Sequence, residues 1–470
     1  MRFRRSRWSI AVAAALLAVS CGSDRGDAPE TAATSAPTSE QAPDTSTSQG
    51  EMFGDLPSPC GEGDASGATD VGVTDESITI GYGDDAGYPS SPGLNHEMSD
   101  AVSALIEWCN AQGGINGRTI IGKYYDAKIL DVNNAMITAC NDGVFMLVGQ
   151  GWVLDASQEE QRVGCELASI PAYSVSPEFA HGPFMRAGVP NPTDMTPLQY
   201  AAAFQRLFPD AIKKTALMYG NFAATRDSAE KVRQGFPAFG FEILDCDQEY
   251  NLGGEDDWKP FVQRLKDCGA EVVYFAGEAQ PNFQNFLNAA AQLQYRPKYL
   301  VDANFYEDAF AQWNAQNGGA ADNVYVRMAF IPFEEADHSP ATQKYIDLIT
   351  ASGGDISLLG AQAADAFLLW ATAVKACGSD VTRECVLEQV DAIKDWTGGG
   401  LHAPTNPGEN RPPECGLLLK LEGGSYVRVD PPQPGTFDCD PSYVQPVTGE
   451  VVDRVKLDEN RVSTLYVNSR

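Results

Sequence analysis

Residues 77–125 decide the fold class, and they read SITIGYGDDAGYPSSPGLNHEMSDAVSALIEWCNAQGGINGRTIIGKYY. Apolar residues alternate with others over 77–82, which predicts a strand, and they recur at helical spacing over 98–111, which predicts an amphipathic helix. Gly113-Gly114 ends that helix, and a turn leads into a second strand over 119–125. A strand, a helix and a second strand in immediate succession are typical of a parallel sheet covered by helices.

The same alternation continues along the chain, in two blocks and a third section. In the first block, a continuous apolar strand is expected over 144–148. In the second, four strands are expected over 215–219, 241–244, 271–275 and 298–301, each preceded by a helix. The third section holds an extended run, three long helices and a hairpin, at 324–330, 340–350, 360–377, 382–393 and 417–429. The pattern predicts an α/β protein with two doubly wound parallel-sheet lobes. We expect the late helices to return to the first lobe and the hairpin to complete the second.

Composition limits the function classes. The 470 residues include 33 Lys+Arg and 64 Asp+Glu, a formal net charge of −31, and 43% are hydrophobic. The hydrophobic fraction is enough for a globular core. The negative charge repels phosphates, so we expect neither nucleic acid nor an anionic membrane surface as a partner.

The N-terminus predicts export. Residues 1–20 combine four arginines with a short apolar run, as in a signal peptide. Ala18-Val19-Ser20-Cys21 resembles the lipobox of bacterial lipoproteins, so we expect Cys21 to carry lipid at the outer face of the cell membrane. The alternative is a structural cysteine after an ordinary cleavage site. Residues 22–58 hold almost no large apolar residue, and we expect a flexible tether over 21–70.

The ten cysteines after Cys21 suit five disulfides in an exported protein. Proximity in the sequence or between expected elements suggests the pairs Cys377–Cys385, Cys415–Cys439, Cys246–Cys268 and Cys109–Cys140, which leaves Cys60–Cys165. There is no C-x-x-C, and the four histidines are scattered, so we expect no metal site and no cofactor.

Two segments carry a family resemblance. Both resemble the branched-chain amino-acid (leucine/isoleucine/valine-type) substrate-binding proteins of ABC importers. The first, GVTDESITIG at 72–81, is similar to the opening strand of that family, and the second, WCNAQGGINGR at 108–118, is similar to its helix-to-strand turn. The resemblance spans about residues 71–400. It implies a type I periplasmic-binding fold, in which two lobes joined by three hinge crossovers close on a small ligand and present it to an ABC permease.

The resemblance also implies where a ligand binds, namely in the loops that follow the strands. In the first lobe, the loop at 149–153 lacks the usual serines, so its backbone amides or Trp152 must serve, while Ser174 and Ser176 keep the expected hydroxyls. In the second lobe, Phe222, Glu278 and Asn304 occupy the corresponding loops.

Each of these residues has a plainer role open to it. The serines can cap the turn before Pro177, Trp152 can pack between the lobes, and Glu278 can cap a helix. Tyr88, beside Asp84 and Asp85, follows the first strand and is a candidate contact for a cation or an ammonium group.

We expect a signal peptide at 1–20, followed by a lipidated cysteine and tether at 21–70. We expect lobe 1 at 71–195 and 324–398, and lobe 2 at 196–323 and 399–470, the last of these ranges with a C-terminal tail. The function that we expect is a monomeric, lipid-anchored solute-binding protein, not an enzyme, that captures a small polar, zwitterionic solute such as an amino acid or amide. Two alternatives stay open. One is a ligand-sensing subunit of a membrane signalling complex, and the other is an exported hydrolase, although no G-x-S-x-G, H-E-x-x-H or phosphate-binding loop motif occurs.

Overall fold

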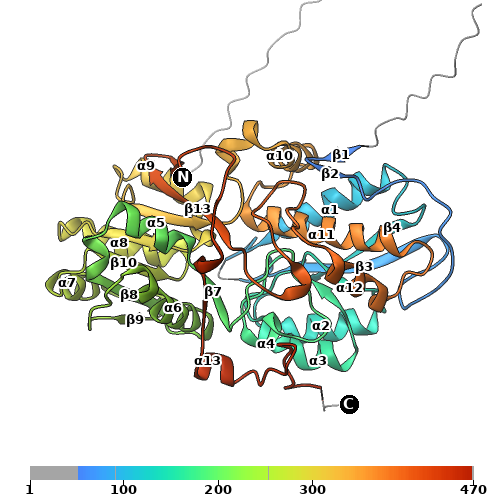
Figure 1. Ribbon diagram of the computed structural model, residues 1–470, viewed down its shortest axis with the longest axis horizontal. Coiled ribbons are helices and arrows are strands. Elements are labelled where there is room, and N and C mark those ends of the chain that lie inside the picture. The colour runs from blue at the N-terminus through green and yellow to red at the C-terminus, as the bar shows by residue number, and fades with distance from the viewer. Residues whose placement is uncertain (1–50, 90, 252, 468–470) are drawn as a thin grey trace, which may run out of the picture. The chain divides into compact units, whose positions relative to one another are not determined.

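The computed structural model describes residues 51–89, 91–251 and 253–467 (Figure 1). The expected signal peptide, residues 1–20, and Cys21 lie outside the described residues, as does the expected tether as far as residue 50.

Lobe 1 is built on a four-stranded parallel sheet with the order β4-β3-β5-β6. The strands are β3 (Ser77–Asp84), β4 (Thr119–Asp126), β5 (Leu147–Val148) and β6 (Ser169–Ile170). The helices of this part of the chain are α1 (His96–Asn110), α2 (Val132–Asn141), α3 (Glu159–Gly164) and α4 (Pro177–Ala180). Gly114 sits between α1 and β4 at φ +77°, where a Cβ would lie 2.0 Å from the Arg118 carbonyl oxygen, so this turn needs glycine.

Three later helices complete lobe 1: α10 (Pro340–Ser352), α11 (Leu358–Cys377) and α12 (Arg383–Ala392). Both α10 and α11 pack against α1, and α12 packs against α11 (Figure 1). Most of the α11 side chains are buried, Phe367 and Trp370 among them, so α11 is the central helix of this lobe.

Lobe 2 contains a larger sheet with the order β14-β13-β12-β11-β10-β8-β9, and β15 pairs with β13. Its parallel strands are β8 (Thr215–Gly220), β9 (Gln248–Tyr250), β10 (Val272–Ala276), β11 (Lys298–Val301) and β12 (Val324–Met328). The strands β13 (Cys415–Glu422), β14 (Ser425–Asp430) and β15 (Asp438–Cys439) run antiparallel to their partners. The helices here are α5 (Gln199–Leu207), α6 (Ala223–Gly235), α7 (Lys259–Asp267), α8 (Gln284–Gln292) and α9 (Asp308–Gln316).

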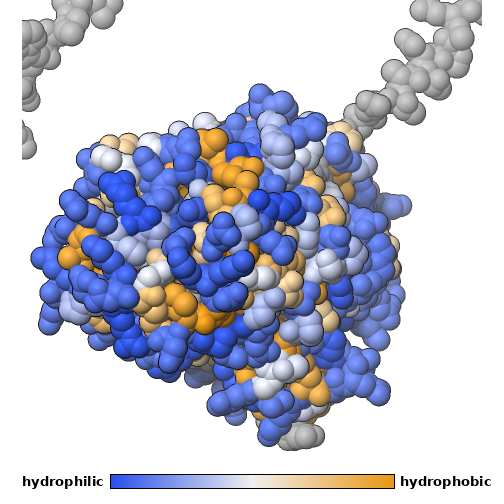
Figure 2. All heavy atoms as spheres, turned by 60° about the vertical axis from the view of Figure 1, so that its left-hand side comes forward, coloured by the Kyte–Doolittle hydropathy of each residue, from blue (hydrophilic) through white to orange (hydrophobic). Residues whose placement is uncertain are grey.

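All five residues of β10 are buried, as expected for a central parallel strand with both faces covered. The face seen in Figure 2 is mostly hydrophilic, with apolar residues in separate patches. The two parallel-sheet lobes confirm the predicted fold class. No helix among the described residues is both long and apolar enough to cross a membrane.

Within the described residues, three segments connect the lobes before the C-terminal segment. They lie between α4 and α5, between β12 and α10, and between α12 and β13. We call them the first, second and third crossovers. The first contains β7 (Met195–Pro197), which pairs with β16 (Val444–Pro446) near the C-terminus.

The C-terminal segment after β16 returns from lobe 2 to lobe 1. It contains α13 (Glu450–Asp453) and, beyond it, Arg454, which contacts Asp227 on α6 of lobe 2 and lies 3.7 Å from Glu178 on α4 of lobe 1. The amide of Ser463 donates a hydrogen bond of 2.7 Å to the His181 carbonyl oxygen in lobe 1. This segment therefore contacts both lobes, rather than forming a tail of lobe 2 alone as expected.

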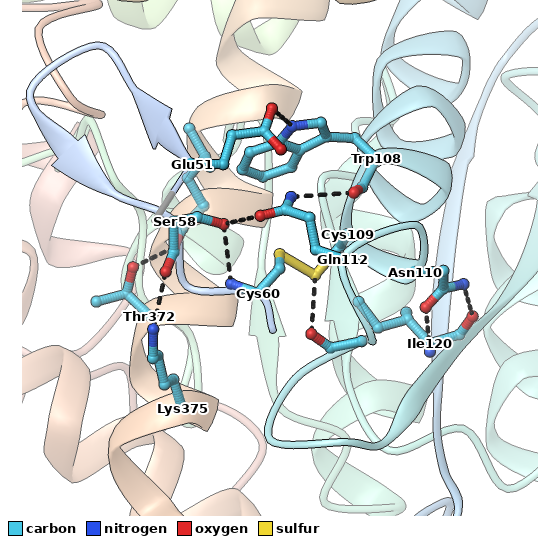
Figure 3. Close-up of a disulfide and its surroundings, with 12 residues drawn as sticks. Glu51, Ser58, Cys60, Trp108, Cys109, Asn110, Gln112, Ile120, Thr372 and Lys375 are labelled. Carbon is cyan, nitrogen blue, oxygen red and sulfur yellow. Dashed lines mark hydrogen bonds between the residues drawn. A yellow bond between two sulfur atoms is a disulfide. The ribbon is translucent and has the colours of Figure 1, made fainter. Parts of the chain in front are cut away.

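The expected tether was wrong for residues 51–70, which pack against lobe 1. They include the short strands β1 (Met52–Phe53) and β2 (Leu56–Pro57). Trp108 of α1 donates a hydrogen bond of 2.7 Å to Glu51, and Ser58 donates one of 2.7 Å to Gln112 (Figure 3). The fully buried Phe53 explains the failure of the prediction, because a single aromatic anchor in a polar stretch leaves no periodic pattern.

The five disulfides join Cys60–Cys109, Cys140–Cys165, Cys246–Cys268, Cys377–Cys385 and Cys415–Cys439. The last three have the partners that the sequence suggested. The predicted pairs Cys109–Cys140 and Cys60–Cys165 were wrong. Residues 51–60 lie against α1 and bring Cys60 to Cys109 (Figure 3), while α2 packs beside α3 and brings Cys140 to Cys165.

Candidate functional site

A cavity of about 150 Å³ lies where the two lobes and the crossovers meet, and we call it the crossover cavity. Residues of all three crossovers line it, together with the loop after β6 in lobe 1, residues of β12 and η5 (Ala303–Phe305) in lobe 2, and α11. Its polar lining is Tyr173, Ser174, Asn191, Gln199, Tyr200, Arg327 and Gln362, and its apolar lining includes Val189, Met328, Phe330 and Leu358. A cavity formed by both lobes and their connections is suited to couple ligand binding to lobe closure.

Arg327 is the only charged residue among the described residues that line the crossover cavity. It projects from β12, where its Nε donates a hydrogen bond of 2.5 Å to Asp302 Oδ1, and its guanidinium lies 5.6 Å from the centre of the Tyr200 ring. Asp302 is held in turn by Tyr274, whose hydroxyl donates a bond of 2.8 Å, and by Ser228 at 3.2 Å. These partners fix the position of the guanidinium.

The electrostatics keep this pair ionised. Burial acts to raise the pKa of Asp302, but the Arg327 charge and the hydrogen bonds outweigh it and hold that pKa below its usual value. Burial acts to lower the pKa of Arg327, and Asp302 more than compensates by raising it. The side chain of Arg327 nevertheless remains 32% exposed, and it lines the crossover cavity, so a ligand there meets an ionised side chain.

Two further polar groups at the crossover cavity have capacity for a ligand. Among the described residues, Arg327 forms a hydrogen bond only through Nε, so both terminal nitrogens can donate. Gln362 Oε1 on α11 is buried and accepts no hydrogen bond from the described residues. A buried amide oxygen without a donor costs about 1–3 kcal/mol, which a ligand with an N–H or O–H group can recover.

A second cavity, of about 230 Å³, also lies between the lobes, and we call it the acidic cavity. Its lining contains Glu97 and Asp355 from lobe 1, Glu307 and Asp308 from lobe 2, and the aromatic side chains of Tyr306, Phe333 and Tyr426. Burial raises the pKa of Glu307 to about 7, since a hydrogen bond from Gln280 offsets burial only in part and the carboxylates of Glu97 and Glu278 add to the increase.

Of the seven predicted ligand contacts, only Ser174 is among the described residues that line either cavity. Ser176 caps α4, because its hydroxyl accepts a bond of 3.2 Å from the Phe179 amide, which is the plainer role that the sequence left open. Trp152 is 1% exposed and belongs to the core of lobe 1 with Val132 and Met136. The expectation that Trp152 forms a ligand platform does not fit this position, because its ring is covered by its own lobe.

The other predicted contacts lie after parallel strands, as expected, but none of them is among the described residues that line the crossover cavity. Asn304 Nδ2 donates a hydrogen bond of 2.8 Å to the Gly277 carbonyl oxygen, so the structure brings the loops of Asn304 and Glu278 together. Burial raises the pKa of Glu278, and its carboxylate accepts a hydrogen bond from Asn282. Phe222 immediately precedes α6 and is half-buried.

The acidic pair beside Tyr88 is used inside lobe 1. Asp84 is fully buried and accepts hydrogen bonds of 2.6 Å from the Tyr124 hydroxyl and 2.5 Å from Ser99. Asp85, also buried, accepts bonds from the amides of Ile129 at 2.6 Å and Val153 at 2.8 Å. These carboxylates are occupied within lobe 1, where Asp85 holds the loops after β4 and β5, so the structure does not support a cation site at Tyr88.

Sequence reasoning missed Asp155, which shapes the Ser174 loop. Its side chain accepts bonds of 2.7 Å from the Val175 amide and 2.9 Å from the Ser176 amide. It is 1% exposed, and this burial outweighs the hydrogen bonds and raises its pKa to about 7. Nothing in the sequence distinguishes this acid from a solvated helix cap.

Sequence reasoning also missed Arg327, Tyr200 and Gln362. Arg327 had a usable signal, because it is the one charged residue of the apolar run Val324–Met328. No group of three His, Cys, Asp or Glu side chains suited to a metal ion occurs among the described residues.

Comparisons with known proteins agree with this architecture. A family model described as periplasmic binding protein matches residues 77–425, while a search of curated proteins finds no match. The chain resembles the solved structure of a fatty acid ABC transporter substrate-binding protein from Thermomonospora curvata, with a TM-score of 0.63, 16% identity, and coverage of 82% of this chain and 97% of that one.

It also resembles an ABC transporter solute-binding protein from R. palustris in complex with 4-hydroxybenzoate, with a TM-score of 0.62, 16% identity, and coverage of 75% of this chain and 96% of that one. A third structure is the branched-chain amino acid transporter substrate-binding protein LivJ from Streptococcus pneumoniae in complex with isoleucine, with a TM-score of 0.60, 15% identity, and coverage of 75% and 100%. At these identities the likeness is one of fold. The family match over residues 77–425 shows that the chain belongs to the periplasmic binding protein family, with the type I fold that its strand and turn motifs predicted.

Proposed function

We propose that this protein is an extracytoplasmic solute-binding protein that captures a small polar solute between its lobes and presents it to the permease of an ABC importer. The single observation that carries the proposal is the crossover cavity, which both lobes and all three crossovers line. A ligand held there touches every part that must move when the lobes close, so it favours the closed state by its differential contacts.

The solute that we propose is zwitterionic or amide-like, since the crossover cavity combines a cationic group with a buried hydrogen-bond acceptor and apolar walls. The strand β12 (Val324–Met328), which we expected in lobe 1, pairs with β11 and β13 of the lobe 2 sheet. We therefore propose that residues 71–195 and 329–398 act as one moving body, and that residues 196–328 and most of 399–470 act as the other. We also propose that the protein works as a monomer. Binding, not catalysis, is the proposed role. Ser174 is proposed as a ligand contact; Glu278, Asn304, Phe222 and Tyr88 stay predictions that ligand contacts must test.

A thermal-shift screen tests the proposal. Purified protein is heated with amino acids, their amides, hydroxybenzoates, urea and amines, each at millimolar concentration. We expect at least one compound to raise the melting temperature by several degrees in a concentration-dependent way, because binding to the folded state alone stabilises it. If no compound does so, solute binding is refuted for these classes.

We further propose that lipid on Cys21 holds the protein at the outer face of the cell membrane. The sequence around this residue supports the proposal. In a bacterial host, the Cys21→Ser variant is expected to appear in the soluble exported fraction, while the unchanged protein sediments with membranes. Equal distribution of the two proteins would contradict lipid anchoring.

A further inference from the structure

The charges around the crossover cavity differ from those of the rest of the chain. The whole sequence carries −31, and the acidic cavity is lined by four carboxylates among its described residues. The crossover cavity has no carboxylate among its described lining residues and one guanidinium, that of Arg327. Asp302, the ion-pair partner of Arg327, is not among the lining residues, so the guanidinium is the charged group that a ligand in this cavity meets, and it favours an anionic group.

A second cation lies close behind this wall. Lys231 on α6 donates a hydrogen bond of 2.7 Å to the Pro192 carbonyl oxygen of the first crossover, next to the lining residue Asn191. Asp302 neutralises one of the two positive charges, through Arg327. Lys231 has the carboxylates of Asp227 and Asp194 near it as well, so Arg327 stays the one charged group among the described residues that line the cavity.

The loops of lobe 1 are less suited to hold an anion. The family resemblance places a ligand carboxylate on hydroxyls and amides after the third and fourth strands, but three of those groups form hydrogen bonds within lobe 1 here. The amides of Val175 and Ser176 donate to Asp155, and the Ser176 hydroxyl caps α4. Of the two serines in this loop, only Ser174 lines the crossover cavity.

On these grounds we propose that the ligand is a small carboxylate whose anionic group binds the two terminal nitrogens of Arg327, on the lobe 2 side. An N–H or O–H group of the same ligand donates a hydrogen bond to Gln362 Oε1, on the lobe 1 side. A guanidinium and a carboxylate match in a bidentate geometry. Because the two anchors belong to different lobes, a ligand that satisfies both joins the lobes. This inference rests on the proposed function, and it assigns the anion to Arg327 instead of to the lobe 1 loops.

The test compares matched ligands on matched variants by isothermal titration calorimetry. The panel contains the twenty common amino acids, 4-hydroxybenzoate, lactate and 4-hydroxybutyrate, each with its amide, and a set of simple amines and sugars. We expect a carboxylate to bind and its amide to bind at least about 10-fold more weakly, because a charge-assisted pair is lost. We expect Arg327→Gln to weaken the carboxylate by about 10- to 100-fold, and Arg327→Lys to weaken it less.

Variant design separates binding from folding. Because Arg327→Gln leaves Asp302 buried without its partner, the double variant Arg327→Gln/Asp302→Asn removes both charges together. Arg428→Gln is the matched control: Arg428 on β14 forms a comparable ion pair with Glu335 of the second crossover, yet neither residue lines either cavity. We expect this control to lose stability and to keep its affinity.

Each outcome decides one of the two claims. The anion assignment is overturned, while solute binding stands, if an amide, amine or sugar binds the wild type as tightly as any carboxylate. It is also overturned if the carboxylate keeps its affinity in both the single and the double Arg327 variants. If nothing in the panel binds the wild type, the proposed function fails for these classes and the assignment fails with it.

Discussion

Replacing Cys60 and Cys109 with alanine removes a bridge that spans 49 positions of sequence. In the chain-entropy account, a disulfide stabilises a protein by restricting the unfolded chain, and the effect grows with the logarithm of the loop length. For a loop of this length the expected loss is about 4 kcal/mol of the free energy of unfolding. The Cys377–Cys385 bridge spans only 8 positions, and the same relation gives about 2.5 kcal/mol.

This second bridge is the matched control, because both disulfides lie in lobe 1 and report on the same transition. Urea unfolding is followed by tryptophan fluorescence, to which Trp108, Trp370 and Trp396 contribute from that lobe. We expect the Cys60→Ala/Cys109→Ala variant to lose about 1.5 kcal/mol more than the Cys377→Ala/Cys385→Ala variant. An equal or smaller loss would refute the claim that residues 51–70 are tied to α1 as a folded part of the body.

The following predictions concern other parts of the molecule. Non-reducing peptide mapping is expected to recover Cys60 linked to Cys109, and a peptide linking Cys60 to Cys165 would contradict the fold of the N-terminal segment. Arg454→Ala is expected to lower the free energy of unfolding by about 1–2 kcal/mol, because it removes a partly buried ion pair with Asp227. Loss of a comparable, fully exposed ion pair has no measurable effect. An unchanged urea midpoint would show that the C-terminal segment does not stabilise the lobes. The pKa of Asp155 rises from 3.8 to about 7 on folding, so the folded state holds the proton more tightly and the contribution of this residue to stability falls as pH rises from about 4 to 7. Between pH 5 and pH 8 the wild type should therefore lose more stability, or gain less, than Asp155→Asn, and identical pH profiles would count against the burial of this charge.

The sequence predicted what depends on local pattern. The alternating apolar residues over 77–82 lie in β3, and the apolar residues at helical spacing over 98–111 lie in α1 or directly after it. Such short-range patterns could be predicted because they place apolar side chains on one face of an element, independently of distant parts of the chain. The Cys377–Cys385 pair could be found for the same reason, since its partners are neighbours along the chain.

What failed depends on distant parts of the chain. The position of Cys60 is set by the packing of Phe53 and Glu51 against α1, and no repeat in the sequence reports that contact. Trp152 follows a parallel strand, as a ligand contact would, yet it turns into the core beside α2. A loop position predicts nearness to the ligand edge of a sheet, but not the direction of a side chain.

The candidate site was predicted by place more than by residue. Ser174 follows β6 and lines the crossover cavity, as its loop position suggested. Gln362 lies within the apolar helix α11 and gave no signal, because only the tertiary packing of α11 makes this residue part of the cavity lining.

The most direct measurement is a crystal structure of the protein with the compound that stabilises it most in the thermal-shift screen. We expect ligand density in the crossover cavity, within hydrogen-bonding distance of Arg327 and Gln362, with both lobes in contact with the ligand. Density confined to the acidic cavity, or to the outer surface of one lobe, would contradict it.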